Sequence, residues 1–346
     1  MMQKELLPWH YQAWAHLCQF ITQNRLPQAL LISGSRGLGN HQLAEHFASS
    51  LLCDSPQSSH LSCGHCSSCL LLAAETHPDY LIVKPEEPGK TITIGQIRSL
   101  ITRLTLKPQF EHYRVVIINP AEQMNNAAAN AFLKCLEEPT ERTLIVLITD
   151  KPAQLPATIR SRCQKLVVER PNQELQGKWL RQQNVDDNLE LLYNLSQGSP
   201  LLAQSYANDK LLMLRKQCFT AWLSVAKKQI HPVMVAEDWH KLTEVPLLFW
   251  MTSWVIDLIK CCYQTQALNL FNPDLYEDLK ELSQQLELTR LYMLYDLLLL
   301  SRQRWETQVN KQSMYEEILI QWFEITRDTR HGRPDNTPTR HIVAFN

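Results

Sequence analysis

The sequence predicts an α/β domain built on a parallel sheet, followed by two helical domains. Apolar runs rich in β-branched residues alternate with helical patterns up to about residue 170, and only helical patterns follow. Continuous apolar strands separated by helices are typical of a parallel sheet covered on both faces. The expected domains are an α/β domain at 1–168, a small helical domain at 169–207, a larger helical domain at 208–330 and a loose tail at 331–346.

Each expected element has its own local signal. The predicted strands are 29–33, 80–83, 114–118, 144–149 and 165–168. One helix is indicated by apolar residues at the spacing of a single helical face, namely Ile97, Leu100, Ile101 and Leu104. Alanines and leucines favour another helix before Pro139, which ends it. Beyond residue 209, repeats such as Leu291, Leu294 and Leu298 predict helices throughout.

Composition excludes several classes of protein. The chain has 346 residues, of which 45% are apolar and 20% charged, and its formal net charge is −1. A stand-alone DNA-binding protein would carry a basic bias, so any contact with nucleic acid is expected to be shared with partners. The apolar runs are far shorter than the roughly 20 residues that span a bilayer. Residues 1–8 lack a signal-peptide pattern, so we expect a cytoplasmic protein without membrane contact.

Four of the ten cysteines fall close together and predict a metal site. Cys53, Cys63, Cys66 and Cys69 include two overlapping Cys-x-x-Cys spacings, which direct sulfurs toward one tetrahedral ion. Zinc with a structural role is the favoured occupant in a reducing compartment, where disulfides are rare. An iron–sulfur cluster and unligated thiols remain the alternatives. His60 and His65 lie near in sequence, but four thiolates already complete the shell.

A glycine-rich turn after the first strand has the layout of a phosphate-binding loop. Gly34, Gly37 and Gly39 stand between the strand at 29–33 and a helical pattern. A working loop then needs Lys to neutralise phosphate and Ser or Thr to hold Mg²⁺, and this chain has Asn40 and His41. We interpret the glycines as a retained tight turn, with residual nucleotide binding as the alternative.

Three segments carry a family resemblance: CGHCSSCLLLAAETHPDYLIV at 63–83, AAANAFLKCLEEP at 127–139 and ATIRSRCQKL at 157–166. Through them the chain resembles the delta-prime family of bacterial DNA polymerase III clamp-loader subunits. The resemblance is strongest over 25–170 and weaker to about 327. It implies an AAA+ fold, in which 1–168 is the ATPase-like domain with an inserted zinc module at 53–69, 169–207 is the lid and 208–330 is the oligomerising collar.

The resemblance also implies partners. They are the delta subunit and three tau or gamma subunits in a heteropentamer, which acts with the sliding clamp and primed DNA during replication. The assembly belongs to a bacterial, cytoplasmic holoenzyme with DNA-directed DNA polymerase (nucleotidyltransferase) activity. The chain itself is expected to be a non-hydrolysing structural subunit. An active ATPase of the tau/gamma type is the main alternative, and a zinc-containing DNA-binding regulator is a third.

The family places its chemistry at one arginine. Arg162, in the segment SRC, matches the arginine finger that reaches a neighbouring subunit's nucleotide. The acidic pair expected after the strand at 114–118 is replaced by Asn119 and Pro120, and Glu122 is interpreted as a surface helix residue. No sensor arginine occurs in 198–204. We therefore expect no bound ATP and no hydrolysis by this chain.

Overall fold

The computed structural model consists of two compact units, Met1–Ser205 and Tyr206–Asn346. It describes residues 5–87, 89–110, 113–137, 140–208, 211–242, 245–263, 270–305 and 310–327. The expected tail at 331–346 lies outside these residues. Within the described ranges, no helix combines the length and the apolar character that a bilayer crossing requires.

The first unit is built on a five-stranded sheet with the order β2-β3-β4-β1-β5, and every neighbouring pair is parallel. The strands are β1 (Ala29–Ser33), β2 (Tyr80–Val83), β3 (Arg114–Ile118), β4 (Thr143–Thr149) and β5 (Gln164–Val167). Every residue of the three central strands is buried, because helices cover both faces of the sheet. The predicted parallel sheet is confirmed, and the strand bounds shift by one residue at β4 and β5.

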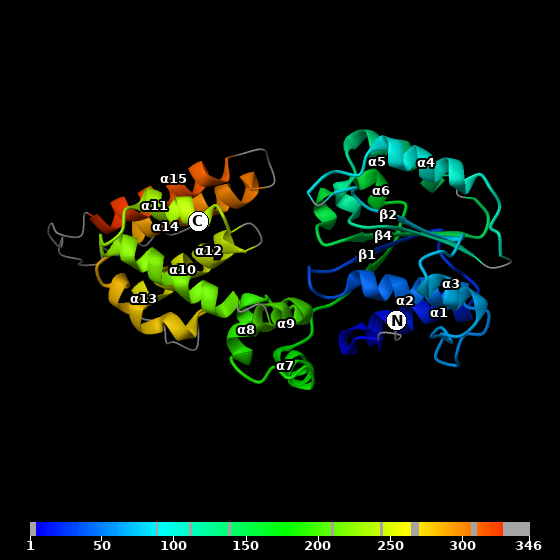
Figure 1. Cartoon of the computed structure of the whole chain (residues 1–346), viewed down its shortest axis with the longest axis horizontal. Helices are drawn as coiled ribbons and strands as arrows, with labels where there is room; N and C mark the ends of the chain where they lie inside the picture. The colour runs from blue at the N-terminus through cyan, green and yellow to red at the C-terminus, as the bar shows by residue number, and fades with distance from the viewer. Residues whose placement is uncertain are drawn as a thin grey trace, which may run out of the picture. The chain divides into compact units, whose positions relative to one another are not determined.

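Two groups of helices enclose this sheet, as Figure 1 shows. On one face lie α1 (Tyr11–Thr22) and α2 (Asn40–Leu52), and on the other lie α4 (Ile94–Leu104), α5 (Asn126–Glu137) and the short α6 (Ala157–Arg160). On the second face Val116 of β3 packs with Ile97 of α4 and Phe132 of α5, all fully buried. This packing brings the carboxyl ends of β1, β3 and β4 to one edge of the sheet, where parallel sheets bind ligands.

A buried ion pair joins the ends of two strands. Arg114, the first residue of β3, donates from Nη2 to Oδ1 of Asp79 at 3.2 Å, and both side chains are at most 5% exposed. The other Asp79 oxygen accepts the backbone N–H groups of Gln109 and Phe110 at 2.8 and 2.9 Å. The rest of the guanidinium donates to the backbone carbonyls of Arg103, Leu106 and Lys107. Because every polar group of this buried pair has a partner, removing either residue would leave an uncompensated buried charge and strongly lower the free energy of unfolding.

Only helices follow β5 in the described part of the chain. A small group directly after the sheet is formed by α7 (Gln173–Gln182), α8 (Leu189–Leu195) and α9 (Pro200–Asn208). Trp179 of α7 packs edge-on against Trp9, with ring centroids 5.1 Å apart, and so joins α7 to the 3-10 turn Pro8–His10. The lid boundaries at 169–207 stay a prediction, since the first compact unit runs through Ser205.

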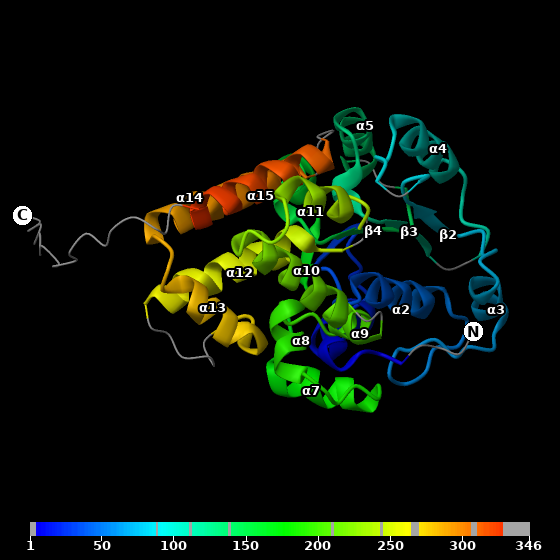
Figure 2. The same cartoon turned by 60° about the vertical axis from the view of Figure 1, so that its left-hand side comes forward.

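The second unit is helical in its described residues. It contains α10 (Leu211–Ala226), α11 (Pro232–Trp239), α12 (Leu247–Cys262), α13 (Tyr276–Ser283), α14 (Leu288–Arg304) and α15 (Lys311–Arg327). Figure 2 shows α12, α14 and α15 packed side by side. Trp222 of α10 and Trp322 of α15 stack with centroids 3.9 Å apart, and Trp254 of α12 lies beside them. All three tryptophans are buried in the core of this unit.

Replacing Asp79 with Ala is expected to lower the free energy of unfolding by about 3 to 5 kcal/mol, because Arg114 would stay buried without its counter-charge. Urea denaturation of the whole chain measures this change. Glu174→Ala is the matched control: Glu174 pairs with Lys178 on the surface at 2.6 Å, and its loss should change the free energy of unfolding far less than the loss of Asp79. Equal losses in the two variants would contradict the assigned role of the buried pair.

Candidate functional site

The turn between β1 and α2 is held by the side chain of Asn40. Asn40 is buried, and its Nδ2 donates to the backbone carbonyl of Gly34 at 2.8 Å. A Cβ on Gly34 would lie 2.7 Å from Oδ1 of Asn40 and 3.0 Å from the carbonyl oxygen of Val168. The first glycine is therefore required by close packing. The residue that replaces the expected lysine folds back onto the turn as part of that packing.

The helix α9 lies against the middle of the same turn. Gly37 has a φ of +84°, which favours glycine, and its carbonyl accepts the backbone N–H of Leu201 at 3.1 Å. A Cβ on Gly37 would come within 2.8 Å of Cβ of Leu202 and 3.2 Å of Cβ of Ser199. The residues that begin α9 thus pack over the turn. They belong to the segment 198–204, in which the sequence has no sensor arginine.

The N-terminal segment covers the third part of the turn. The backbone carbonyl of Leu38 accepts Nε1 of Trp9 at 2.8 Å and Nε2 of His10 at 2.7 Å. Since a carbonyl can only accept, His10 carries a proton on Nε2. Gly39, with a φ of +76°, has Leu7 and His10 around the position that a Cβ would take. The glycine turn is consequently fixed from three directions by Asn40, by α9 and by the N-terminal segment.

His41 and Ser35 show how the remaining polar side chains of the turn are engaged. Nε2 of His41 lies 3.3 Å from Oε1 of Glu45 within α2, so this side chain pairs with its own helix. Oγ of Ser35 accepts Nε and Nη2 of Arg170 at 2.9 and 2.7 Å. Arg170 lies 135 residues away from Ser35 in sequence and gave no signal of this contact. Arg170 thus places a cation beside the turn, and the sequence did not predict this cation.

The end of β3 lacks acidic residues. Asn119 and Pro120 follow the strand directly, joined by a cis peptide bond. Glu122 was expected on a surface helix, and this expectation was wrong: it lies in the 3-10 turn Ala121–Gln123 and is half-buried. Burial is the main cause that raises the pKa of its carboxyl, and a hydrogen bond with Asp150 adds to the rise. Oγ1 of Thr149 accepts the backbone N–H of Lys151 at 3.0 Å, so Thr149 caps the end of β4.

Arg162 lies between α6 and β5, with its side chain 38% exposed. Its Nη2 donates to Oε1 of Glu137 at 2.7 Å, and its Nη1 donates to the backbone carbonyl of Thr158 at 3.0 Å. The guanidinium is therefore accessible to solvent while two acceptors of its own chain hold it. This cationic group is about 120 residues from the turn in sequence, and the prediction that it acts on a neighbouring nucleotide is not tested by its geometry.

The four clustered cysteines are brought together, and their sulfurs can hold a metal ion. The Sγ atoms of Cys53, Cys63, Cys66 and Cys69 all lie within 4.8 Å of one another. Cys53 Sγ is 3.8 Å from Cys66 Sγ, and Cys63 Sγ is 3.9 Å from Cys69 Sγ. Four sulfurs about 2.3 Å from a tetrahedral ion would lie about 3.8 Å apart. The geometry therefore fits the donor set that the spacing predicted.

Backbone groups around the cluster also favour thiolates. The N–H groups of Cys63, Cys66 and Cys69 donate to the sulfurs of Cys53, Cys63 and Cys66 at 3.3 to 3.4 Å. A backbone hydrogen bond with His65 is the largest effect that lowers the pKa of Cys63 to about 5. Burial instead raises the pKa of the Cys53 and Cys69 thiols, so a cation would be needed to hold all four as thiolates.

The two histidines beside the cluster bind elsewhere. Nε2 of His60 lies 3.4 Å from Oγ1 of Thr22, and Nδ1 of His65 lies 3.0 Å from the backbone carbonyl of Cys63. Cys53 follows the last residue of α2, and Cys66 caps α3 (Ser67–Ala73) by accepting the N–H of Cys69. A metal here would connect the end of α2, which begins at the glycine turn, to the segment leading into β2.

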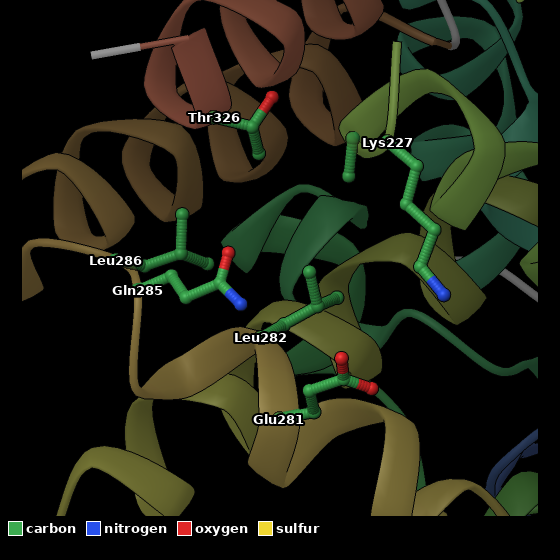
Figure 3. Close-up of a pocket in the computed structure, with 7 residues that line it drawn as sticks. Lys227, Glu281, Leu282, Gln285, Leu286 and Thr326 are labelled. Carbon is green, nitrogen blue, oxygen red and sulfur yellow. The ribbon is translucent and has the colours of Figure 1, made fainter. Parts of the chain in front are cut away.

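A small pocket in the second unit offers no comparable chemistry. It has a volume of about 170 Å³ and is lined by Ala226, Lys227, Glu281, Leu282, Gln285, Leu286 and Thr326. Figure 3 shows Lys227 on one side of the pocket and Glu281 on another. Ligand pockets usually measure about 300 to 1,000 Å³. Its size and its lack of paired catalytic groups make it a surface hollow.

His10 should make stability depend on pH. Burial lowers its pKa from 6.5 to about 4, an effect larger than the opposing hydrogen bond to Leu38. The unfolded chain binds the proton first, so the stabilisation is complete above pH 6.5 and is lost as pH falls toward 4. This loss is on the order of 3 kcal/mol. The control is His10→Gln, which keeps an N–H donor but does not titrate. The free energies of unfolding of the wild type and of this variant should diverge as pH falls through that window, and the same pH dependence in both would contradict the assignment.

The purified chain should contain stoichiometric metal bound by the four cysteines, measured by elemental analysis. Cys69→Ser is expected to lose that metal and to lower thermal stability, because three thiolates hold the ion far less tightly than four. Cys18→Ser is the matched control, since Cys18 lies outside the cluster, and it should retain the metal. Metal-free wild-type protein would refute the site.

Comparison with known proteins identifies the family. The family model described as DNA polymerase III, delta subunit, matches residues 9–172, and the model described as DNA polymerase III, delta subunit, C terminal, matches residues 209–324. The chain is 34% identical over 327 residues to DNA polymerase III subunit delta' of Pseudomonas aeruginosa, covering 93% of this chain and 98% of that relative. It is 30% identical to the Escherichia coli subunit, covering 90% and 94%.

Among solved structures, a DNA polymerase III gamma subunit-related protein from Thermotoga maritima aligns with a TM-score of 0.46 and 18% identity, covering 91% of this chain and 100% of that one. The sequence relatives match along nearly their whole length, and the two family models together span both units. On this evidence the chain belongs to the family of DNA polymerase III delta' subunits.

Proposed function

We propose that this chain is the non-hydrolysing delta' subunit of a clamp-loading complex, which completes the ATP site of a neighbouring subunit with Arg162. The observation that carries the proposal is a contrast within one domain. The chain's own glycine turn is packed by Asn40 and α9, whereas the guanidinium of Arg162 is partly exposed. We therefore assign this chain's part in ATP hydrolysis to Arg162.

Each part of an ATPase site that depends on a side chain is missing or changed. Asn40 provides no cation for the β- and γ-phosphates, and His41 pairs with Glu45 and offers no hydroxyl for Mg²⁺. Asn119 and Pro120 supply no carboxylate at the end of β3. The altered turn, the missing acidic pair and the absence of a sensor arginine in 198–204 are three independent losses. Together they support loss of hydrolysis and weigh against the alternative of an active tau/gamma-type ATPase.

Arg162 suits the role of an arginine finger chemically. A guanidinium is always charged and its planar N–H groups match the oxygens of a γ-phosphate. Supplied in trans, such a group stabilises the charge of the transition state and can accelerate hydrolysis by roughly 10³ to 10⁵. In this proposal the neighbour is a tau or gamma subunit, and the delta subunit completes the heteropentamer that loads the sliding clamp onto primed DNA in the bacterial cytoplasm.

The proposed metal is structural zinc. Four thiolates with the observed spacing form the closed tetrahedral set that zinc prefers, and such a set leaves no open position for a substrate. When bound, the ion supplies no catalysis and fixes the segment between α2 and β2. An iron–sulfur cluster is the alternative occupant, and the elemental analysis described above separates the two.

In a reconstituted loader, Arg162→Ala should lower DNA-stimulated ATPase. With three ATPase subunits in the loader, of which one depends on this finger, the steady-state rate should fall by at least about a third, and further if the sites are coupled. Arg162→Lys is the matched variant: it keeps the charge but loses the planar fork, and it should also be impaired. The wild-type chain alone should hydrolyse no ATP. Normal turnover with Arg162→Ala would refute the finger, and hydrolysis by the isolated chain would favour an active ATPase.

A further inference from the structure

The acceptor that holds Arg162 in the free chain is Glu137, the last residue of α5. The two side chains meet at 2.7 Å, and Arg162 is bound at the same time to the carbonyl of Thr158 in α6. The guanidinium is therefore clasped between two elements of its own domain. Neither Glu137 nor this contact has a place in the function proposed above.

The ion pair between Arg162 and Glu137 is weak enough for another anion to replace Glu137. Both side chains are well exposed, at 38% for Arg162 and 52% for Glu137, so water and salt weaken their attraction. Exposed pairs of this kind contribute little to stability. A phosphate carries more charge and offers more acceptor oxygens than a carboxylate, so a γ-phosphate presented to Arg162 would be the stronger partner.

We propose that Glu137 is a holding residue for Arg162: it competes with the neighbouring subunit's γ-phosphate for the guanidinium and is displaced when ATP is bound there. This inference rests on the proposed function of Arg162. A carboxylate and a phosphate repel each other at one guanidinium, so the two acceptors exclude one another. Holding the arginine raises the ATP concentration that the neighbouring site needs, and it leaves the rate of the engaged site unchanged.

The test is steady-state ATPase of the reconstituted loader carrying Glu137→Gln, with the KM for ATP and kcat measured separately. Gln keeps the size and hydrogen-bonding capacity of the side chain but removes the competing charge. The KM of the ATP site that receives Arg162 should fall by roughly two- to fivefold, the effect of one exposed pair, at unchanged kcat. The KM of the whole loader should fall by less, because its other sites do not depend on Arg162. The difference from wild type should shrink as ionic strength rises from about 0.05 to about 0.5 M, because salt already screens the pair.

Two further variants separate the possible failures. Glu141→Gln makes the same change of charge at an exposed position that forms no pair with Arg162, and its KM should equal that of the wild type. The combination Glu137→Gln with Arg162→Ala should behave as Arg162→Ala alone, since nothing is left to hold. An unchanged KM in Glu137→Gln, or a lower kcat, would overturn the holding role while leaving the finger intact. Normal ATPase in Arg162→Ala would overturn the finger and the holding role together.

Discussion

Buried backbone carbonyls need a hydrogen-bond partner, and this need shapes the turn between β1 and α2. Its carbonyls at Gly34, Gly37 and Leu38 are satisfied by Asn40, by the first turn of α9, and by Trp9 with His10. Each partner comes from a different part of the unit. The turn is therefore a packing centre that fixes the N-terminal segment and α9 to the sheet. The glycines are required there whether or not a nucleotide binds.

Arg162, the residue proposed to act on a nucleotide, lies with the helices that cover the other face of the sheet. The helices α5 and α6 pack on the face opposite α2, and Glu137 and Arg162 lie where these two helices end. The same sheet thus carries a turn without the side chains of hydrolysis and an arginine that remains accessible. This contrast supports the proposal that the subunit acts on a neighbour's nucleotide and hydrolyses none of its own. The cysteine cluster lies apart in sequence from both the turn and Arg162, between α2 and β2.

The sequence predicted those features that local patterns determine. Apolar β-branched runs placed all five strands within one residue, and the Cys-x-x-Cys spacings predicted sulfurs that do converge. Long-range pairs escaped prediction because no periodicity links their members. Arg170 meets Ser35 across 135 residues, and Arg162 meets Glu137 across 25. Glu122 was misplaced for a related reason: its burial depends on a turn packed beside β4, which its neighbours in sequence do not reveal.

We propose that this chain does not bind ATP itself. Calorimetry tests this directly by measuring equilibrium binding of ATP with Mg²⁺ to the isolated subunit. With Asn40 and His41 in the turn and no carboxylate directly after β3, we expect no saturable binding up to about 1 mM ATP. Stoichiometric binding with a Kd below about 10 µM would contradict it, because a turn that serves packing alone would not retain that affinity.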